Sequence, residues 1–299
     1  MKKKISVFFV LLLFVVSQAF SVNYQSDFNK YFDSKDFANQ LKTLKLWEES
    51  NPKDAELYTS YFNYYFAKSR EEVLSLTTNE PTGEALILQD STGKVAGYLG
   101  SEITTDKGNF KMCLKKIDEG ISLYPNRLDM RFGKIYALGQ VKDWDNFTKE
   151  IIESIKYSKV NSNNWTWTNN QKKDDGMEFF LGSLQDYQLQ LYNTEDDKLL
   201  TNMRDIANTV LEIYPTHIES LSNLSITYMI SKNYDKAIEV LLRAENLNPK
   251  DGIVLMNLAH AYKMKGDKDK SVQYYKKAIE FVDAESKEYA KKQISELKK

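Results

Sequence analysis

The sequence predicts an all-α chain in which helix pairs stack side by side into a superhelix. Three observations favour this fold class: apolar residues recur at helical spacing, the pattern repeats with a period of 34 residues, and turn-forming residues are scarce. Glycine and proline number only 12 and 5 in 299 residues, which favours long helices. With 42% hydrophobic and 28% charged residues, the composition is that of a globular protein able to bury a core.

The period is clearest in two consecutive blocks, Ile218–Asp251 and Gly252–Glu285, where eight positions recur at one constant offset. Those positions are Leu221, Leu224, Ser225, Tyr228, Ala237, Leu241, Ala244 and Pro249, followed by Leu255, Leu258, Ala259, Tyr262, Ser271, Tyr275, Ala278 and Asp283. Each block indicates two amphipathic helices with a small residue where a neighbouring helix approaches closely. This pattern resembles the tetratricopeptide repeat (TPR). The resemblance implies a right-handed α-superhelix of about five or six helix pairs, with the first helix of each pair lining a concave surface.

The first element is predicted to be an export signal. Lys2 to Lys4 form a basic stretch, Ile5 to Val16 an apolar run, and Ser17 to Ala19 a small-residue cleavage site. This order is typical of a secretory signal peptide, and the run is shorter than the roughly 20 residues of a membrane-spanning helix. We therefore expect cleavage of residues 1–19, with no stable membrane insertion afterwards. The mature chain, 20–299, is expected to be one superhelical domain in the periplasm or outside the cell.

Further copies of the repeat are expected along the mature chain. Lys35–Asp54 aligns without gaps to Lys232–Asp251, and both segments end in Asn-Pro-Lys-Asp. A degenerate copy begins after Pro125, and a weaker helix pair covers residues 177–214. The Lys/Glu-rich tail, residues 284–299, suits a capping helix that covers the last repeat.

Residues 70–106 do not fit the repeat and predict a β-hairpin insertion. Residues 84–90 and 94–99 have the composition of strands, and Ser91-Thr92-Gly93 that of a turn. The Thr-Gly-Lys sequence is not a phosphate-binding loop, because Leu88 and Val95 stand where that motif needs Gly and Ser or Thr. No nucleotide is therefore expected here, and the hairpin is expected to flank the superhelix or to dock on a partner by its edge.

A second interruption, residues 159–174, is rich in Trp and Asn. Trp165 and Trp167 are two residues apart, so on an extended backbone both would project to one side. Exposed aromatic rings beside amides would suit a protein ligand or a sugar. The alternative is a long loop that is held by one Trp tucked between helices.

Charge and residue counts argue against several kinds of chemistry. Lys+Arg (41) and Asp+Glu (42) nearly balance, which does not favour nucleic-acid binding. With two His and one Cys, we expect no His/Cys metal cluster and no internal disulfide. Cys113 should be buried in a helix, unless it pairs between molecules. His217 is expected to cap a helix or to pack against one, and the sequence contains no nucleophile motif. We therefore predict no cofactor and no enzymatic activity. Catalysis by carboxylates alone remains an open alternative.

The concave surface is the predicted binding site. Asn223 and Asn257 share the sixth repeat position, where the family resemblance implies a hydrogen bond to a bound peptide backbone; Arg131 falls at the same position of the degenerate copy. His260 is expected to face the groove, and Met256 with Met229, Ile230 and Met264 to make it apolar. Alternatively, the Asn residues cap or bridge neighbouring helices. The prediction is a non-catalytic scaffold or adaptor that binds a protein or peptide. A glycan-binding module centred on Trp165 and Trp167 is the second hypothesis, and a hydrolase on a repeat scaffold the third.

Overall fold

The computed structural model describes residues 23–80 and 84–298. The predicted signal peptide lies outside these residues. Within them the chain forms thirteen α-helices, three strands and two short 3-10 turns. The helices are α1 (Tyr24–Asp33), α2 (Phe37–Ser50), α3 (Ala55–Ser69), α4 (Lys107–Leu123), α5 (Leu128–Gln140), α6 (Trp144–Val160), α7 (Gly176–Tyr192), α8 (Leu200–Ile213), α9 (Ile218–Ile230), α10 (Tyr234–Leu247), α11 (Gly252–Lys265), α12 (Lys268–Ala278) and α13 (Ala284–Leu297).

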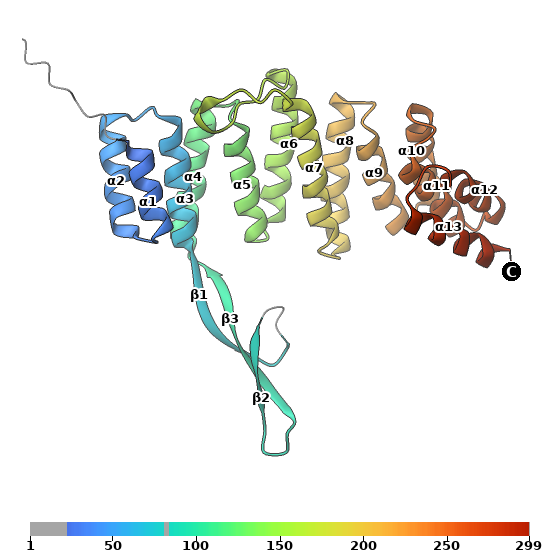
Figure 1. Ribbon diagram of the computed structural model, residues 1–299, viewed down its shortest axis with the longest axis horizontal. Helices are drawn as coiled ribbons and strands as arrows, with labels where there is room; N and C mark the ends of the chain where they lie inside the picture. Colours follow the sequence, from blue (N-terminus) through green and yellow to red (C-terminus); the bar gives the residue numbers. More distant parts are fainter. Residues whose placement is uncertain (1–22, 81–83, 299) are drawn as a thin grey trace, which may run out of the picture.

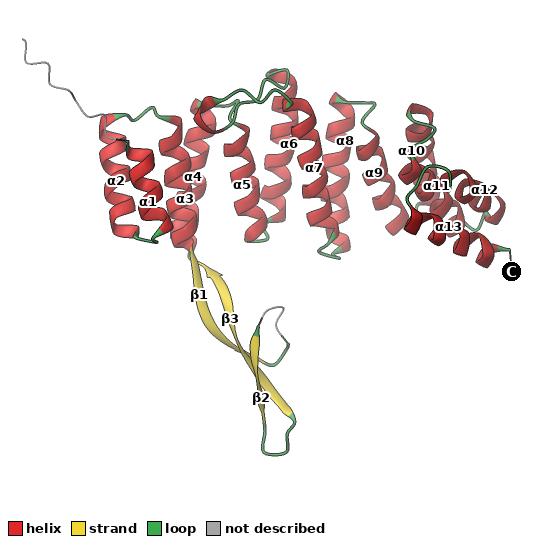
Figure 2. Cartoon of the chain, viewed as in Figure 1, coloured by secondary structure: helices red, strands yellow, loops and turns green. Residues whose placement is uncertain are grey.

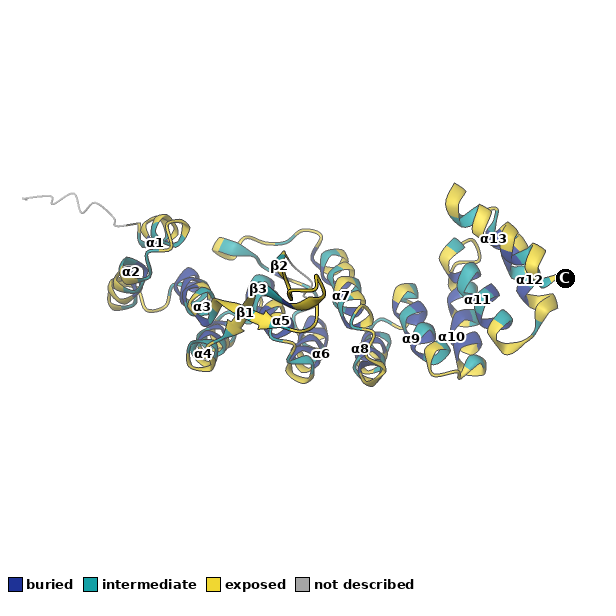
Figure 3. Cartoon of the chain, turned by 90° about the horizontal axis from the view of Figure 1, so that it is seen from below, coloured by how far each residue is buried: buried dark blue, intermediate teal, exposed yellow. Residues whose placement is uncertain are grey.

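The helices stand side by side in sequence order and form one elongated array (Figure 1). Seen along their axes, α1, α3, α5 and α7 lie in one layer and α2, α4, α6 and α8 in the other, and α9 to α12 continue the array (Figure 3). The buried faces lie between the layers and between successive pairs (Figure 3). The predicted all-α superhelix is therefore confirmed, with six helix pairs followed by α13 in the described chain.

The turns inside the helix pairs share one local design. Lys35, Lys142, Glu195, Lys232 and Gly266 all have positive φ angles between 53° and 90°. Each precedes an Asp or Asn whose side chain accepts a hydrogen bond from a backbone N–H of the helical turn that follows. A left-handed residue stops the first helix, and the Asx side chain satisfies free N–H groups at the start of the second. Only the α3–α4 pair lacks this turn among the six described pairs.

The small residues of the repeat lie where the helices touch. Ser225, Ala237, Ala259 and Ser271 have no solvent-exposed surface. The Ser271 hydroxyl donates to the Ala259 carbonyl at 2.8 Å, which is possible only because both side chains are short. The close-contact positions expected from the 34-residue period are therefore the contacts between successive helices.

A three-stranded antiparallel sheet takes the place of the α3–α4 turn and projects away from the helices (Figures 1 and 2). Its strands are β1 (Arg70–Thr77), β2 (Ala85–Gln89) and β3 (Val95–Thr105), in the order β1-β3-β2. The predicted hairpin is β2 with the first half of β3, and β1 was not expected as a strand. We call the three strands the arm.

The C-terminal helix α13 continues the array beyond the last pair. Ala290 packs with Ala259 of α11 and Tyr275 of α12, and Ile294 and Leu297 lie against the same cluster. The tail therefore covers the apolar end of the last repeat. No helix in the described ranges is both long enough and apolar enough to cross a bilayer.

Candidate functional site

The two asparagines predicted to line the concave surface differ in their surroundings. The Asn223 side-chain amide in α9 donates to Gln185 Oε1 in α7 at 2.6 Å. Asn223 therefore bridges two neighbouring first helices, which is the alternative role considered for it. Asn257 in α11 is half-buried, and its side chain makes no hydrogen bond within the described residues.

The expected groove role of Arg131 is wrong. Arg131 is buried between α5 and α6, pairs with Glu150 at 3.4 Å and lies over the Tyr157 ring at 4.6 Å. Burial lowers the pKa of Arg131, and the Glu150 carboxylate only partly offsets this effect. The sixth repeat position turns inward here because a buried carboxylate faces it from the second helix of the pair.

Two further predicted groove residues, Met256 and His260, lie on α11. Met256 packs against the α11–α12–α13 cluster, so it is partly used as core. His260 is half-buried, and burial together with the positive charge of Lys263 lowers its pKa. These surroundings favour the neutral form of the His260 imidazole.

The loop tryptophans do not form the pair of exposed rings that an extended backbone would give. Trp165 is 0% exposed and packs its indole ring against Phe180 (5.2 Å between centroids) and Tyr157 (5.9 Å). Trp167 is half-buried against Phe132 and Phe179. A binding role for Trp165 is therefore wrong, because its ring offers no face to a ligand. The loop held by one Trp between helices is the alternative that the structure supports.

Chemistry-bearing side chains do not gather elsewhere in the part of the chain that the structure describes. No group of three His, Cys, Asp or Glu residues there could hold a metal ion. One charge cluster joins Lys134, Asp118, Glu150 and Arg131 between α4, α5 and α6. Glu150 is 3% exposed in this cluster, so the cluster links helices and offers no open site.

A continuous hollow surface lies along one edge of the superhelix, where the first helix of a pair ends and the second begins. Three adjoining hollows run from the arm to the end of α9, and neighbouring hollows share lining residues. In order from the arm, the first and second hollows share Lys142, and the second and third share Asn193 and Asp196. We call this continuous surface the arm-side groove.

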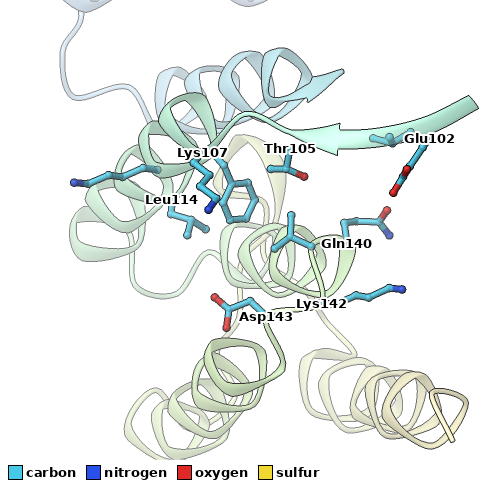
Figure 4. A pocket seen from close by; sticks show the side chains of 11 residues that line it. Glu102, Thr105, Lys107, Leu114, Gln140, Lys142 and Asp143 are labelled. Atoms are coloured by element: carbon cyan, nitrogen blue, oxygen red, sulfur yellow. The ribbon is translucent and has the colours of Figure 1, made fainter. Parts of the chain in front are cut away.

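The first hollow lies at the root of the arm and has a volume of about 670 Å³. Its walls come from the end of β3, the first turns of α4 and the turn between α5 and α6 (Figure 4). It is lined by the half-buried apolar side chains of Phe110, Leu114 and Val141 and by the exposed lysines Lys107 and Lys142. This hollow exists because the sheet replaces the tight turn that the other helix pairs have.

The next two hollows continue the groove towards the C-terminus. One, of about 740 Å³, lies between Trp144 and Leu189, and the other, of about 350 Å³, reaches Tyr192 and Ile230. Leu189, Tyr192 and Ile230 are exposed, and they stand at the ends of successive first helices. Exposed apolar side chains that line a hollow are typical of interaction sites.

The groove carries opposite charges at its two ends. Its arm end is lined by three lysines and two acidic residues, whereas the charged residues that line the hollow at the α7–α8 turn are all acidic. The charged residues at the arm end are Lys107, Lys111, Lys142, Glu102 and Asp143, and those at the α7–α8 turn are Glu195, Asp196 and Asp197. The charge of the groove therefore differs between its two ends. An extended ligand with complementary charges at its own ends would bind in one orientation.

Sequence reasoning found only part of this groove. Ile230 was expected as an apolar residue of the concave surface, and the α7–α8 turn was not predicted to take part in binding. Leu189 and Tyr192 gave a detectable signal, because they are apolar residues outside the buried stripe of α7. Leu189 and Tyr192 line the same groove as Phe110 because of how the turns are arranged in space. A local sequence pattern does not show this arrangement.

Comparisons with known proteins identify repeats in this chain. A family model described as tetratricopeptide repeat matches residues 218–251 and 254–281. These are the two blocks with the clearest period. The chain therefore contains tetratricopeptide repeats, as the sequence resemblance predicted.

Similarity to individual proteins is limited to part of a chain or to low identity. The chain is 35% identical over 77 residues to BBSome complex member BBS4 of Bos taurus, a match that covers 26% of this chain and only 15% of that protein. Among solved structures, the TPR protein YrrB is 14% identical, with 83% of this chain and 97% of that chain covered and a TM-score of 0.41. The C-terminal part of a TPR repeat-containing protein from Cytophaga hutchinsonii is also 14% identical, with 86% and 78% covered and a TM-score of 0.42.

Proposed function

We propose that this chain, which contains tetratricopeptide repeats, is a non-catalytic scaffold that binds an extended segment of a partner protein in the arm-side groove. One observation carries the proposal: three hollows with shared lining residues follow one another across the ends of α5, α7 and α9. A single continuous groove suits a chain-like ligand better than a compact small molecule.

The dimensions and chemistry of the groove define the partner segment. Neighbouring helices pack about 8–10 Å apart, and an extended chain rises about 3.3 Å per residue, so a groove across three pairs accommodates about eight residues. The apolar side chains Leu189, Tyr192 and Ile230 favour apolar residues in the middle of the segment. The basic arm end favours acidic residues, and the acidic α7–α8 turn favours basic ones.

We also propose that this interaction takes place outside the cytoplasm. The proposal rests on the basic, apolar and small-residue order of residues 1–19. Mass spectrometry of the protein purified from its native source would test it. A mature N-terminus at Phe20 is expected, and a chain that retains Met1 or Lys2 would contradict export by cleavage.

Affinity capture from an envelope extract of the source tests the binding proposal. The bait is the chain without residues 1–19, compared with a groove variant, Tyr192→Ala with Ile230→Ala, and a concave-surface variant, Asn223→Ala with Asn257→Ala. Truncating the exposed groove side chains should change stability little. We expect a protein that wild type and the concave-surface variant retain and that the groove variant loses.

The other outcomes of this capture are equally informative. Loss from the concave-surface variant alone would move the site to the surface that carries Asn257. Equal retention by all three baits, or no specifically retained protein, would contradict the proposed groove.

A further inference from the structure

One face of the arm carries a cluster of aliphatic side chains, most of which are exposed. Strand register places Leu76, Leu99 and Leu86 in one row across β1, β3 and β2, because Leu99 is opposite both other residues. Side chains two residues apart on a strand share a face. Leu74 is two residues from Leu76 on β1, and Ile103 is four residues from Leu99 on β3, so both lie on the same face, closer to the root of the arm. Leu88 lies on that face near the tip. We call these six residues the leucine face.

The opposite face has a different composition. It carries Glu71, Glu102, Ser75 and Thr77 among its strand residues, with Ile87 as its most exposed apolar residue. An antiparallel sheet usually has one face packed and the other solvated. On this pattern the leucine face is the one that should be packed, and the polar face the one that should meet water.

Nothing in the described chain covers the leucine face. The arm extends away from the helices (Figures 1 and 2), and Leu74, Leu76 and Leu86 are 80%, 69% and 68% exposed. The face exposes on the order of 500 Å² of apolar surface, at the upper end of the patches that soluble monomers carry. A three-stranded sheet needs a packed hydrophobic face to be stable by itself, so a partner should cover it.

We propose that the occupant of the leucine face is the leucine face of a second copy of this chain. Two such faces would bury on the order of 1,000 Å², about the minimum for a specific interface. Aliphatic side chains from two sheets interdigitate when the sheets pack face to face about 10 Å apart. A two-fold symmetric interface brings the same patch of both copies together, and a cluster of aliphatic side chains can pack against an identical cluster.

The charges at the two ends of the arm match this arrangement. Leu99 lies four residues from Ile103 and four from Val95 along β3, so a two-fold axis that crosses the strands at Leu99, in the plane between the two sheets, places the root of one arm over the tip of the other. Glu72 is opposite Ile103 at the root, and Lys94 adjoins Val95 at the tip. Glu72 of each copy then lies beside Lys94 of the other, and both side chains are exposed in the single chain.

The same charges argue against a lipid surface as the occupant. The root of the arm carries Glu71, Glu72 and Glu102, which anionic lipid headgroups repel. The turn at the tip is Asp90-Ser-Thr-Gly-Lys94, and the Asp90 carboxylate accepts hydrogen bonds from Thr92 and Lys94 N–H groups. A polar tip of this kind does not favour insertion of the arm end-on into a bilayer.

Sedimentation of the chain without residues 1–19 tests the proposal. Wild type is compared with a leucine-face variant, Leu74→Thr with Leu86→Thr, and an opposite-face control, Val73→Thr with Ile87→Thr. Threonine keeps a high strand propensity, so the arm should persist in both variants. We expect a dimer for wild type and the control, and a dissociation constant raised about 100-fold or more for the leucine-face variant.

A charge exchange tests the register of the two arms. Glu72→Lys and Lys94→Glu should each raise the dissociation constant about threefold to tenfold at low salt, and the two changes together should restore it. Circular dichroism provides the folding check, since the arm contains no helix and the helical signal should be unchanged in every variant.

Four results would overturn the proposal. They are a monomeric wild type at about 100 µM, a leucine-face variant that stays dimeric, equal loss of the dimer in the opposite-face control, and a charge-exchanged pair without restored association. A monomeric chain that cosediments with phosphatidylcholine–phosphatidylglycerol vesicles would instead assign the face to a membrane. Capture of a partner in the arm-side groove is a separate measurement, so failure of either proposal is recognisable by itself.

Discussion

The Arg127 guanidinium donates a hydrogen bond to the Glu56 carboxylate at 2.6 Å, although the two residues are 71 positions apart. Glu56 Oε1 also accepts from the backbone N–H of Asn169 at 2.7 Å, and Arg127 makes two further hydrogen bonds to Asp129. Together these contacts fasten the start of α3, the start of α5 and the Trp/Asn loop to one another. None of these residues was singled out from the sequence.

Glu56→Gln should weaken this junction without changing its shape. The neutral amide leaves Arg127 buried with only Asp129 as its ion-pair partner, and a hydrogen bond to a charged group is worth about 1.5–3 kcal/mol. We expect the free energy of unfolding to fall by about 2 kcal/mol and the Trp/Asn loop to become more sensitive to protease. Glu49→Gln, at an exposed position of α2, is the control, and equal stability of the two variants would contradict a structural role for the junction.

Trp165→Ala should be among the most destabilising single changes in the chain. Removing a fully buried Trp typically costs about 3–5 kcal/mol, whereas Trp167→Ala removes a half-buried ring and should cost about 1–2 kcal/mol. Denaturant unfolding followed by circular dichroism measures both. A Trp165→Ala protein with wild-type stability would mean that the loop does not depend on this side chain.

His217 should make stability depend on pH. Its Nδ1 accepts a hydrogen bond from the backbone N–H of Ser220 at the start of α9, and burial lowers its pKa despite the opposing charge of Glu219. Because the folded pKa is below the unfolded value of 6.5, the stabilisation is complete above that pH and is lost as the pH falls through the window below it.

His217→Asn should reduce this pH dependence, since Asn is a good N-cap that does not titrate. We expect the melting temperature of the variant to fall less than that of wild type between about pH 7.5 and pH 5.5. His260→Gln is a useful comparison, because His260 also has a lowered pKa but caps no helix. An equal fall for His217→Asn and wild type would contradict the assignment.

The Cys113 thiol should not react with thiol reagents in the native protein. It is completely buried in α4, and burial raises the pKa of its thiol, so the reactive thiolate is neither accessible nor populated. Ellman's reagent should leave native protein unmodified and react fully in guanidinium chloride. A disulfide-linked dimer of native protein on a non-reducing gel would instead support pairing between molecules.

The helical framework could be predicted from the sequence because its signal is local and repeated. The positions of Ser225 and Ala259 indicated close helix contacts, and the structure places both in the core. Strand β1 was missed, because it begins with Arg70-Glu71-Glu72 and only Leu74 and Leu76 mark an alternating pattern.

The candidate site was harder to predict, since it depends on which residues face one another. Repeat position located Asn223 and Arg131 on their helices, but not Gln185 and Glu150, the side chains they meet on other helices. The same holds for Trp165, which is buried because the chain folds its loop back between helices. Sequence spacing specifies a position on one element, whereas a site requires knowledge of the neighbouring element.

The two ends of the arm meet again where they leave the helices: the Asp106 backbone N–H donates to the Ser69 carbonyl at 2.8 Å. The excursion from Arg70 to Thr105 therefore starts and finishes at the same place, and α3 packs on α4 as other pairs do. Such an insertion is a module. It could be lost, lengthened or exchanged between related chains while the helices on either side keep their packing, so the arm is free to evolve separately from the repeats that carry it.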